Sequence, residues 1–333
     1  MSRFLTALCV LVSVIALPAH ANDSEAETSL GGLTLKQSEH ISMDSEDLFI
    51  SKEQVRVKYR FTNHSDKDVT TLISFPLPTF PRDEEEVWFF MDPPDFGMMP
   101  FETKIDGKLA PLTRVTRAML GERDITERVK ALGWPVNRFG MHGYDWQFNE
   151  MSAEERQPFI EEGLIRKVEY DGVAWFPAWQ VVWHITREQT FPAGKSVTVE
   201  HSYAPLTGGS VGGALHKNVR KDYPEGIAEY RKRYCVDDYF LKGFDKRVAA
   251  KGENGGMNGE TWIGYVLSSG ANWKGPIKDF RLVIDKGSAD NLVSFCMDGI
   301  KKIAPTQFEV RKKNFEPKDD LNILIVEWFN PEG

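Results

Sequence analysis

Long apolar runs, clustered basic residues and cysteines are all scarce in this sequence of 333 residues. Beyond residue 21, no stretch approaches the ~20 apolar residues that a membrane-spanning helix needs. The formal net charge is −8 and the Lys and Arg residues are not clustered, which argues against nucleic acid or an anionic membrane surface as the partner. The histidines lack ligand spacings such as His-x-x-x-His, so we expect no metal site, and no motif predicts a cofactor.

The first 21 residues have the organisation of a cleavable secretory signal. Arg3 supplies the positive charge, Leu5 to Leu17 form a short apolar segment, and Ala19-His20-Ala21 is an A-x-A cleavage site. Cleavage after Ala21 would leave 333 − 21 = 312 residues, and the loss of Arg3 would change the net charge from −8 to −9. The short apolar segment disfavours an uncleaved anchor, and no cysteine stands at the cleavage point for a lipid. We therefore predict an exported, soluble protein without a membrane span.

Only two cysteines, Cys235 and Cys296, belong to the mature chain, because Cys9 lies in the signal. Two thiols and no third in an oxidising compartment favour one disulfide between them. Two separate buried thiols are the alternative, since the sequence does not show that the two Cα atoms lie close enough.

Alternation of apolar and polar residues predicts strands. From Val55 to Phe61 every second residue is apolar and the residues between are Arg or Lys, the pattern of a half-buried strand. Turn residues at 63–66 and a second alternating run over 69–77 predict an antiparallel hairpin with one wet face. A second hairpin is expected within 178–203, turning at Pro192-Ala193-Gly194.

Two segments have helical features instead. Residues 113–165 contain a helical run over 124–132 and a capping box, in which Ser152 is followed three residues later by Glu155. A further helical stretch is expected from Pro224 to Ala250.

Together these patterns predict a mainly β or α+β protein of antiparallel, sandwich-type sheets with helical insertions. Residues 22–205 are expected to form an N-terminal sandwich-like domain that contains the insertion at about 113–165. Residues 206–333 are expected to form a helical segment followed by a strand-rich region. Within that region, Leu321 to Val326 is apolar on both faces, which predicts a central strand.

Residues 208–212 formally match the G-x-S-x-G motif of α/β-hydrolases around Ser210. That motif needs an acidic residue and then a histidine downstream, but His216 follows six residues on with no Asp or Glu between. A flexible glycine loop is the favoured interpretation. A serine hydrolase using Ser210, with His216 or His201 as base, stays open as an alternative because a triad is defined by geometry.

Trp175, Trp179 and Trp183 form a stripe of a kind that can stack on sugars. As a strand, Trp179 and Trp183 share the apolar face, so core packing is favoured for these two. Trp175, ahead of Pro177, is the residue expected to be exposed. A glycan-binding module that uses Trp175 is a second alternative.

Two further patterns could suggest a metal site. In the second expected hairpin Trp183 lies opposite Tyr203, which turns His201 toward the core and His184 to the other face. Side chains on opposite faces cannot share a zinc ion. The acidic run Asp83–Glu86 lacks the spacing of a calcium loop.

Several short sequence segments, spread over nearly the whole mature chain, resemble those of a family of bacterial exported proteins, domain of unknown function 4424. They are Gly31-Gly32-Leu33, Ser45-Glu46-Asp47-Leu48, Val55-Arg56-Val57-Lys58-Tyr59-Arg60-Phe61, Phe75-Pro76-Leu77-Pro78, His201-Ser202-Tyr203-Ala204-Pro205, Asn272-Trp273-Lys274-Gly275-Pro276-Ile277, Val293-Ser294-Phe295-Cys296 and Pro305-Thr306-Gln307-Phe308-Glu309. The resemblance implies a protein of a Gram-negative envelope, which places it in the periplasm, and it brings no catalytic residues.

We accordingly expect a periplasmic, non-catalytic binding or scaffolding module. Strands that offer free edges suit recognition of another protein. The expected partner is an envelope protein or a polymer such as a polysaccharide.

Overall fold

The computed structural model describes residues 23–29, 32–77, 100–137, 146–169, 172–251 and 257–329. The predicted signal, residues 1–21, and the acidic run Asp83–Glu86 lie outside these ranges. Within them, no helix is both long enough and apolar enough to cross a membrane.

Three sheets and a hairpin contain the strands of the described residues. The six-stranded sheet has the order β2 (Gly32–Lys36), β1 (Ser24–Ser29), β5 (Val69–Pro76), β12 (Gln180–Phe191), β8 (Thr113–Leu120), β9 (Arg123–Asp124). The eight-stranded sheet has the order β18 (Lys301–Lys302), β19 (Gln307–Phe315), β16 (Ile277–Asp285), β3 (Ile41–Ile50), β4 (Val55–Asn63), β13 (Ser196–Tyr203), β6 (Phe101–Ile105), β7 (Lys108–Leu109). The four-stranded sheet has the order β14 (Thr207–Val211), β15 (Met257–Tyr265), β20 (Leu321–Phe329), β17 (Leu292–Phe295). The hairpin pairs β10 (Ile165–Glu169) with β11 (Val173–Pro177).

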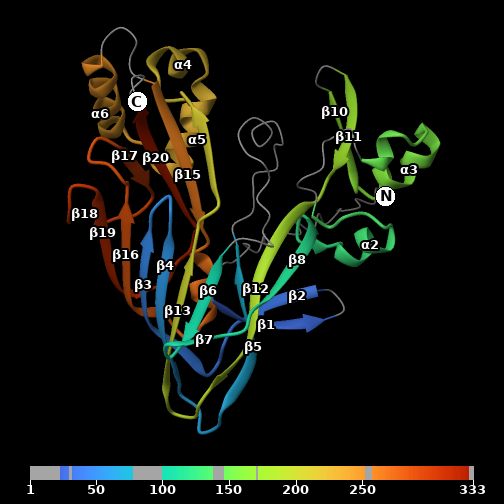
Figure 1. The fold of residues 1–333 in the computed structure, drawn as a ribbon, viewed down its shortest axis with the longest axis vertical. Coiled ribbons are helices and arrows are strands. Elements are labelled where there is room, and N and C mark those ends of the chain that lie inside the picture. The colour runs from blue at the N-terminus through green and yellow to red at the C-terminus, as the bar shows by residue number, and fades with distance from the viewer. Residues whose placement is uncertain are drawn as a thin grey trace, which may run out of the picture.

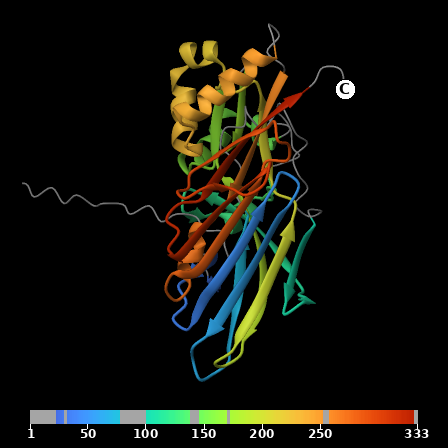
Figure 2. The same ribbon diagram turned by 90° about the vertical axis from the view of Figure 1, so that its left-hand side faces the viewer.

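The helices form two groups at one end of the molecule. Figure 1 shows a helical layer over the four-stranded sheet, made of α4 (Lys217–Asp222), α5 (Pro224–Tyr234) and α6 (Asp238–Ala250). On the other side, the β10–β11 hairpin extends beside α2 (Thr126–Ala131) and α3 (Ala153–Glu161). The turned view in Figure 2 shows the strands of the eight-stranded sheet side by side. Two short 3₁₀ turns, Gln147–Asn149 and Ser268–Asn272, complete the elements described here.

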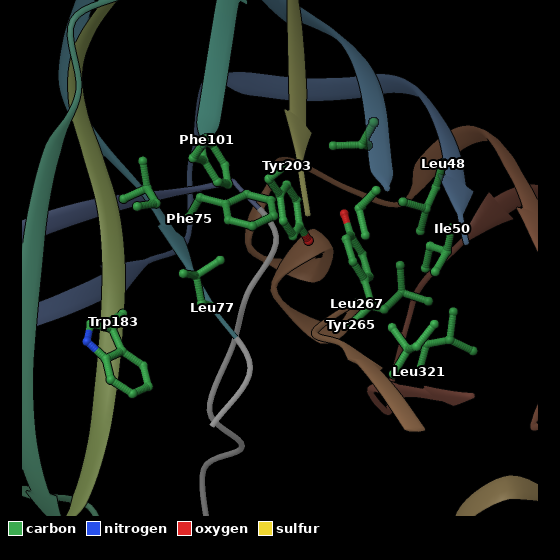
Figure 3. Close-up of a cluster of buried hydrophobic side chains, with 14 of the residues drawn as sticks. Leu48, Ile50, Phe75, Leu77, Phe101, Trp183, Tyr203, Tyr265, Leu267 and Leu321 are labelled. Atoms are coloured by element: carbon green, nitrogen blue, oxygen red, sulfur yellow. The ribbon is translucent and has the colours of Figure 1, made fainter. Parts of the chain in front are cut away.

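One hydrophobic core lies between the six- and eight-stranded sheets and continues to the four-stranded sheet. Figure 3 shows Phe75 of β5 beside Phe101 of β6 and Tyr203 of β13, and the rings of Phe101 and Tyr203 are stacked at 4.9 Å. Tyr265 of β15 reaches the same cluster, 6.4 Å from the Phe75 ring. Large aromatic side chains from three sheets therefore meet at one point, where their burial supplies much of the packing energy.

The predicted faces of the strands are confirmed. In β4 the apolar residues are buried and the Arg and Lys residues between them are exposed. Strand β20 lies between β15 and β17 and is central, as the residues from Leu321 to Val326 indicated. The capping box is also present: Glu155 N–H donates to Ser152 Oγ at 3.3 Å, and Ser152 N–H donates to Glu155 Oε2 at 2.8 Å.

Both predicted hairpins are wrong, because their strands belong to different sheets. Strand β4 leads to β5 across the sandwich, and β12 leads to β13 in the same way. The two connections lie together at one end, where Gly194 N–H donates to the Ser65 carbonyl at 3.1 Å. The buried Asn63 amide donates to the Phe191 carbonyl at 2.9 Å and so joins the strand ends. Alternation determines which face of a strand is buried, but it does not determine which strand pairs with it. A connection that crosses from one sheet to the other buries the same side chains as a hairpin within one sheet would.

The fold class expected from the sequence is confirmed, with two differences in detail. The segment 113–165 is not wholly helical, because it begins with β8, which pairs with β12 over residues 113–119. The eight-stranded sheet also draws strands from both sides of residue 206, since β16 runs parallel to β3.

The predicted disulfide joins Cys235 to Cys296, whose Cα atoms lie 5.1 Å apart. Cys235 follows directly after α5, and Cys296 follows directly after β17. The bridge therefore fastens the helical layer to an edge of the four-stranded sheet.

Replacement of both cysteines by serine should lower the free energy of unfolding by about 4 kcal/mol, the value that chain entropy gives for a separation of 61 residues. Denaturant titration of oxidised protein measures this difference. Reduced wild-type protein is the control and should match the double variant. Equal stability of the oxidised and reduced proteins would contradict the prediction.

Candidate functional site

A buried ion pair with an attached histidine lies inside the sandwich. Arg187 of β12 donates to both carboxylate oxygens of Asp23, from Nη1 to Oδ1 at 3.1 Å and from Nη2 to Oδ2 at 2.6 Å. His201 Nε2 of β13 lies 3.1 Å from Asp23 Oδ2, and its Nδ1 lies 2.8 Å from Thr103 Oγ1 of β6. The exposed fractions are 0% for Asp23, 4% for Arg187 and 2% for His201. We call these four residues the core polar cluster, which joins the six- and eight-stranded sheets.

The charges of the core polar cluster satisfy one another. Burial alone would raise the pKa of Asp23, but Arg187 and His201 outweigh it and hold that pKa well below its usual range. Burial lowers the pKa of His201, and the neighbouring Asp23 only partly opposes this. A neutral imidazole can donate from Nε2 to Asp23 and accept at Nδ1 from the Thr103 hydroxyl. The cluster is thus one ion pair oriented by a neutral histidine.

A hydroxyl, an imidazole and a carboxylate in a row have the order of a catalytic triad. Here Thr103 is buried together with His201, so a substrate could reach the hydroxyl only if the sandwich opened. His201, a candidate base, faces the core as predicted, whereas Ser210 lies on the four-stranded sheet. In the described part of the chain no hydrogen bond connects the two, and the structure does not bring them together.

Ser210 and His216 both lie near the start of the helical layer. Ser210 Oγ accepts from Gly213 N–H at 3.1 Å, while His216 Nε2 lies 2.7 Å from Asn258 Oδ1. No hydrogen bond between Ser210 and His216 occurs among the residues described. The hydrolase stays a prediction. Labelling by a fluorophosphonate that Ser210→Ala abolishes would support it, and an inert wild-type protein would count against it.

The glycines around Ser210 are explained by close packing and not by a flexible loop. Residues 207–211 form β14, an edge strand paired with β15, and Ser210 lies directly opposite Glu260. A Cβ atom on Gly209 would lie 2.4 Å from the Glu260 carbonyl oxygen, and one on Gly213 would lie 1.8 Å from Glu260 Oε1. Neither Gly209 nor Gly213 is a motif glycine. Of the two that are, Gly208 would place a Cβ atom 3.1 Å from the Trp262 side chain, and Gly212 has a φ of +87°, which favours glycine.

Trp175 is half-buried, whereas Trp179 and Trp183 are buried as predicted. The Trp175 backbone exchanges two hydrogen bonds with the Asn149 side chain, at 2.7 and 3.0 Å. The guanidinium of Arg156 lies 5.3 Å from the Trp175 ring centroid. One face of the Trp175 indole ring is therefore already covered by Arg156. The glycan-binding alternative stays a prediction.

A groove of about 340 Å³ crosses the outer face of the eight-stranded sheet. Its walls are mostly charged side chains that point away from the core, because they alternate with the buried residues of the same strands. The lining side chains that the argument needs are Asp47, Phe49, Arg56, Lys58, Glu200 and Arg281. Sequence alternation indicated that Arg56 and Lys58 face outward, but the groove is lined by side chains of five adjacent strands, which no local pattern brings together.

Most charges of the groove are paired. Lys58 Nζ lies 2.9 Å from Glu200, and Arg281 Nη1 lies 3.1 Å from Asp47. The guanidinium carbon of Arg56 lies 4.5 Å from the centroid of the Phe49 ring. Within the described residues no carboxylate contacts Arg56, so the groove holds one cation that is exposed, stacked on an aromatic ring and free of an anion.

No described group of three or more His, Cys, Asp or Glu side chains is arranged to hold a metal ion. His184 Nδ1 contacts Ser74 Oγ at 2.9 Å and lies on the opposite face of β12 from Arg187. Burial, with a smaller contribution from Arg117, lowers the pKa of His184 to about 4.

Replacement of Asp23 by Asn should destabilise the fold by about 3–5 kcal/mol, because it leaves the Arg187 guanidinium buried without a counterion. Unfolding by denaturant at neutral pH measures the loss. Since the pKa of Asp23 is lowered in the fold, its contribution is present above the ordinary Asp range and disappears as the pH falls through the folded value. The free energy of unfolding of the variant should therefore fall less steeply than that of the wild type as the pH is lowered.

A matched control is available on the helical layer. Asp238 pairs with Arg231, and both side chains are largely exposed. Asp238→Asn should change stability far less than Asp23→Asn does, because an exposed ion pair is screened by solvent. Equal effects of the two substitutions would contradict a structural role for the core polar cluster.

Comparisons with known proteins identify a family but no activity. No curated protein matches the sequence significantly. A solved structure from Legionella pneumophila, described as a "putative nutrient binding protein", is 14% identical, with 92% of this chain and 70% of that chain covered and a TM-score of 0.42. A likeness this distant carries no functional argument. Residues 21–324 match the family described as Domain of unknown function (DUF4424), and the chain belongs to that family.

Proposed function

We propose that this protein is an exported, non-catalytic module of the bacterial envelope that binds an acidic group of a partner in the groove of the eight-stranded sheet. The observation that carries the proposal is Arg56, the exposed cation stacked on Phe49 without an anionic partner among the described residues. A guanidinium presents a planar fork of donors that suits carboxylate and phosphate groups.

The neighbouring ion pairs support binding because they are easily rearranged. In the pair of Lys58 with Glu200, the side chains are 62% and 41% exposed. Exposed pairs contribute only about 0–1 kcal/mol, so a ligand can exchange partners with Lys58 at little cost. Arg281 is held more firmly, because its Nε also donates to Glu309 at 2.8 Å. An acidic group that enters the groove would thus meet Arg56 first and Lys58 next.

The proposed partner is a segment of an envelope protein that presents one acidic group to Arg56 and carries side chains of both charges around it. A groove across five strands is long enough for an extended chain. Its alternating acidic and basic side chains can pair with a ligand that carries both charges. An anionic polysaccharide presents one sign of charge, which Asp47 and Glu200 would repel. A polymer partner is therefore an outcome that the experiment must distinguish.

If the protein is exported and cleaved as proposed, the mature chain has one defined mass. Protein purified from the periplasm should begin at Asn22, because cleavage follows Ala21. After treatment with an alkylating reagent it should carry two alkyl groups only when it has first been reduced, since the disulfide uses both cysteines of the mature chain. Intact mass spectrometry with and without reductant checks both statements. A mass that includes residues 1–21 would contradict cleavage.

The groove is tested by site-specific photocrosslinking in intact cells. A photoreactive residue at Ser202, which lines the groove, should give a discrete adduct with one envelope protein. Arg56→Glu in the same chain should weaken capture at least about tenfold, because losing a hydrogen bond to a charged group costs about 1.5–3 kcal/mol. Adducts are identified by mass spectrometry, and digestion by protease or by glycosidase separates a protein from a polysaccharide.

Two controls use neighbouring positions. Arg60→Glu makes the same charge change four residues along β4, outside the groove lining, and should leave capture unchanged. A photoreactive residue at Tyr239, which is 86% exposed on α6, should give no such adduct. If Arg56→Glu and Arg60→Glu reduce capture equally, the groove is not the binding surface.

A further inference from the structure

A second buried carboxyl group, Glu260 of β15, lies between the four-stranded sheet and the helical layer. It is 4% exposed. Its Oε2 accepts from the Tyr230 hydroxyl of α5 at 2.6 Å and from Trp262 Nε1 at 3.2 Å. Its Oε1 is buried and has no hydrogen-bond partner in the described structure. One carboxyl oxygen thus holds α5 on the sheet while the other is unsatisfied.

Among the described residues, the groups that surround Glu260 offer no counterion. Tyr230 faces it from α5, Ser210 from β14, and Val326 lies opposite it on β20. His216, before α4, is engaged by Asn258, and Phe244 of α6 packs on the His216 ring. No Lys or Arg side chain of the described residues forms an ion pair with Glu260. An ionised Glu260 would therefore be a buried charge without compensation, which is costly.

The unsatisfied oxygen is buried and is closely approached by the backbone of the segment before α4. Gly213 lies so close that a Cβ atom there would be 1.8 Å from Glu260 Oε1. A charge on Glu260 can be solvated only if α5 or the segment around Gly213 moves away. Burial accordingly raises the pKa of Glu260, although the hydrogen bonds from Tyr230 and Trp262 oppose this.

The helical layer can move without opening the sandwich because it has its own small core. That core is separate from the main one and consists of Leu215, Tyr234, Val236, Leu241, Phe244, Leu324 and Val326. The disulfide at Cys235 would keep the end of α5 attached to the sheet during such a movement.

We propose that Glu260 is a proton-responsive latch, which holds α5 on the four-stranded sheet when it is protonated and releases α5 when it ionises. An exported chain meets the pH of its surroundings, so the latch would respond to that pH. Because the folded pKa of Glu260 lies above its unfolded value, docking is complete below the ordinary Glu range and weakens as the pH rises through the folded value. With one proton involved, the opening equilibrium rises by up to about tenfold per pH unit.

Hydrogen exchange of the α5 amides in the intact mature protein, from pH 5 to pH 9, tests the latch. After correction for the intrinsic pH dependence of exchange, α5 of the wild-type protein should open more at higher pH. Glu260→Gln, which keeps the shape and both acceptor contacts, should remove this dependence. Tyr230→Phe removes a hydrogen bond that favours the ionised form, so it should move the midpoint to higher pH.

The controls separate the latch from general loosening. Glu225→Gln on the exposed first turn of α5 should keep the wild-type profile. Amides of β4 and β13 in the sandwich should exchange equally in all variants. A pH-independent α5 in the wild-type protein, or a Glu260→Gln profile that follows the wild type, would overturn the proposal. If Glu260→Gln fails to fold, the wild-type profile and the direction of the Tyr230→Phe shift decide. None of these results depends on binding in the groove.

Discussion

The buried pairing of Asp23 with Arg187 is the constraint on which the rest of the structure depends. Arg187 projects from β12 into the core, where a guanidinium is tolerated only beside an anion. The anion comes from a residue 164 positions earlier, and His201 binds the same carboxylate from the opposite sheet. Trp273 Nε1 donates to the Asp23 carbonyl at 2.7 Å, so the C-terminal half of the chain also contacts this point. The sandwich is therefore complete only when the segment at Asp23 is in place.

This dependence joins regions that the sequence separates. Strand β16 runs parallel to β3, which places C-terminal strands beside N-terminal ones in the eight-stranded sheet. The contacts of Asp23 with β12 and β13 join the six-stranded sheet to it. All of these distant strand pairings must form before water is excluded from the core polar cluster. Until then its charged groups stay hydrated and their mutual interactions stay weak. The two sheets and the cluster consequently stabilise one another as one cooperative unit.

Much of the fold, but little of the site, could be predicted from the sequence. Alternation within β4, the capping box at Ser152 and the apolar β20 are local patterns, and the structure confirms them. The neighbours of β4 were predicted wrongly, because an arch and a hairpin bury the same face. Asp23 and Glu260 had no local signal at all: each is an acidic residue among polar neighbours, as surface residues are. Only distant partners, Arg187 for Asp23 and Tyr230 for Glu260, determine that they are buried.

The acidic residues of this protein have different roles because their surroundings differ. Asp23 has a full set of partners inside the core, and removing one would cost several kcal/mol, so it stabilises the fold. Glu200, exposed beside Lys58, gains little from its partner and leaves the groove free to exchange ions with a ligand. Glu260 is intermediate, since it is buried but, in the described part of the chain, only one of its oxygens has a hydrogen-bond partner. A carboxyl group in that position is stable in one protonation state only, and for this reason it can couple the position of α5 to pH.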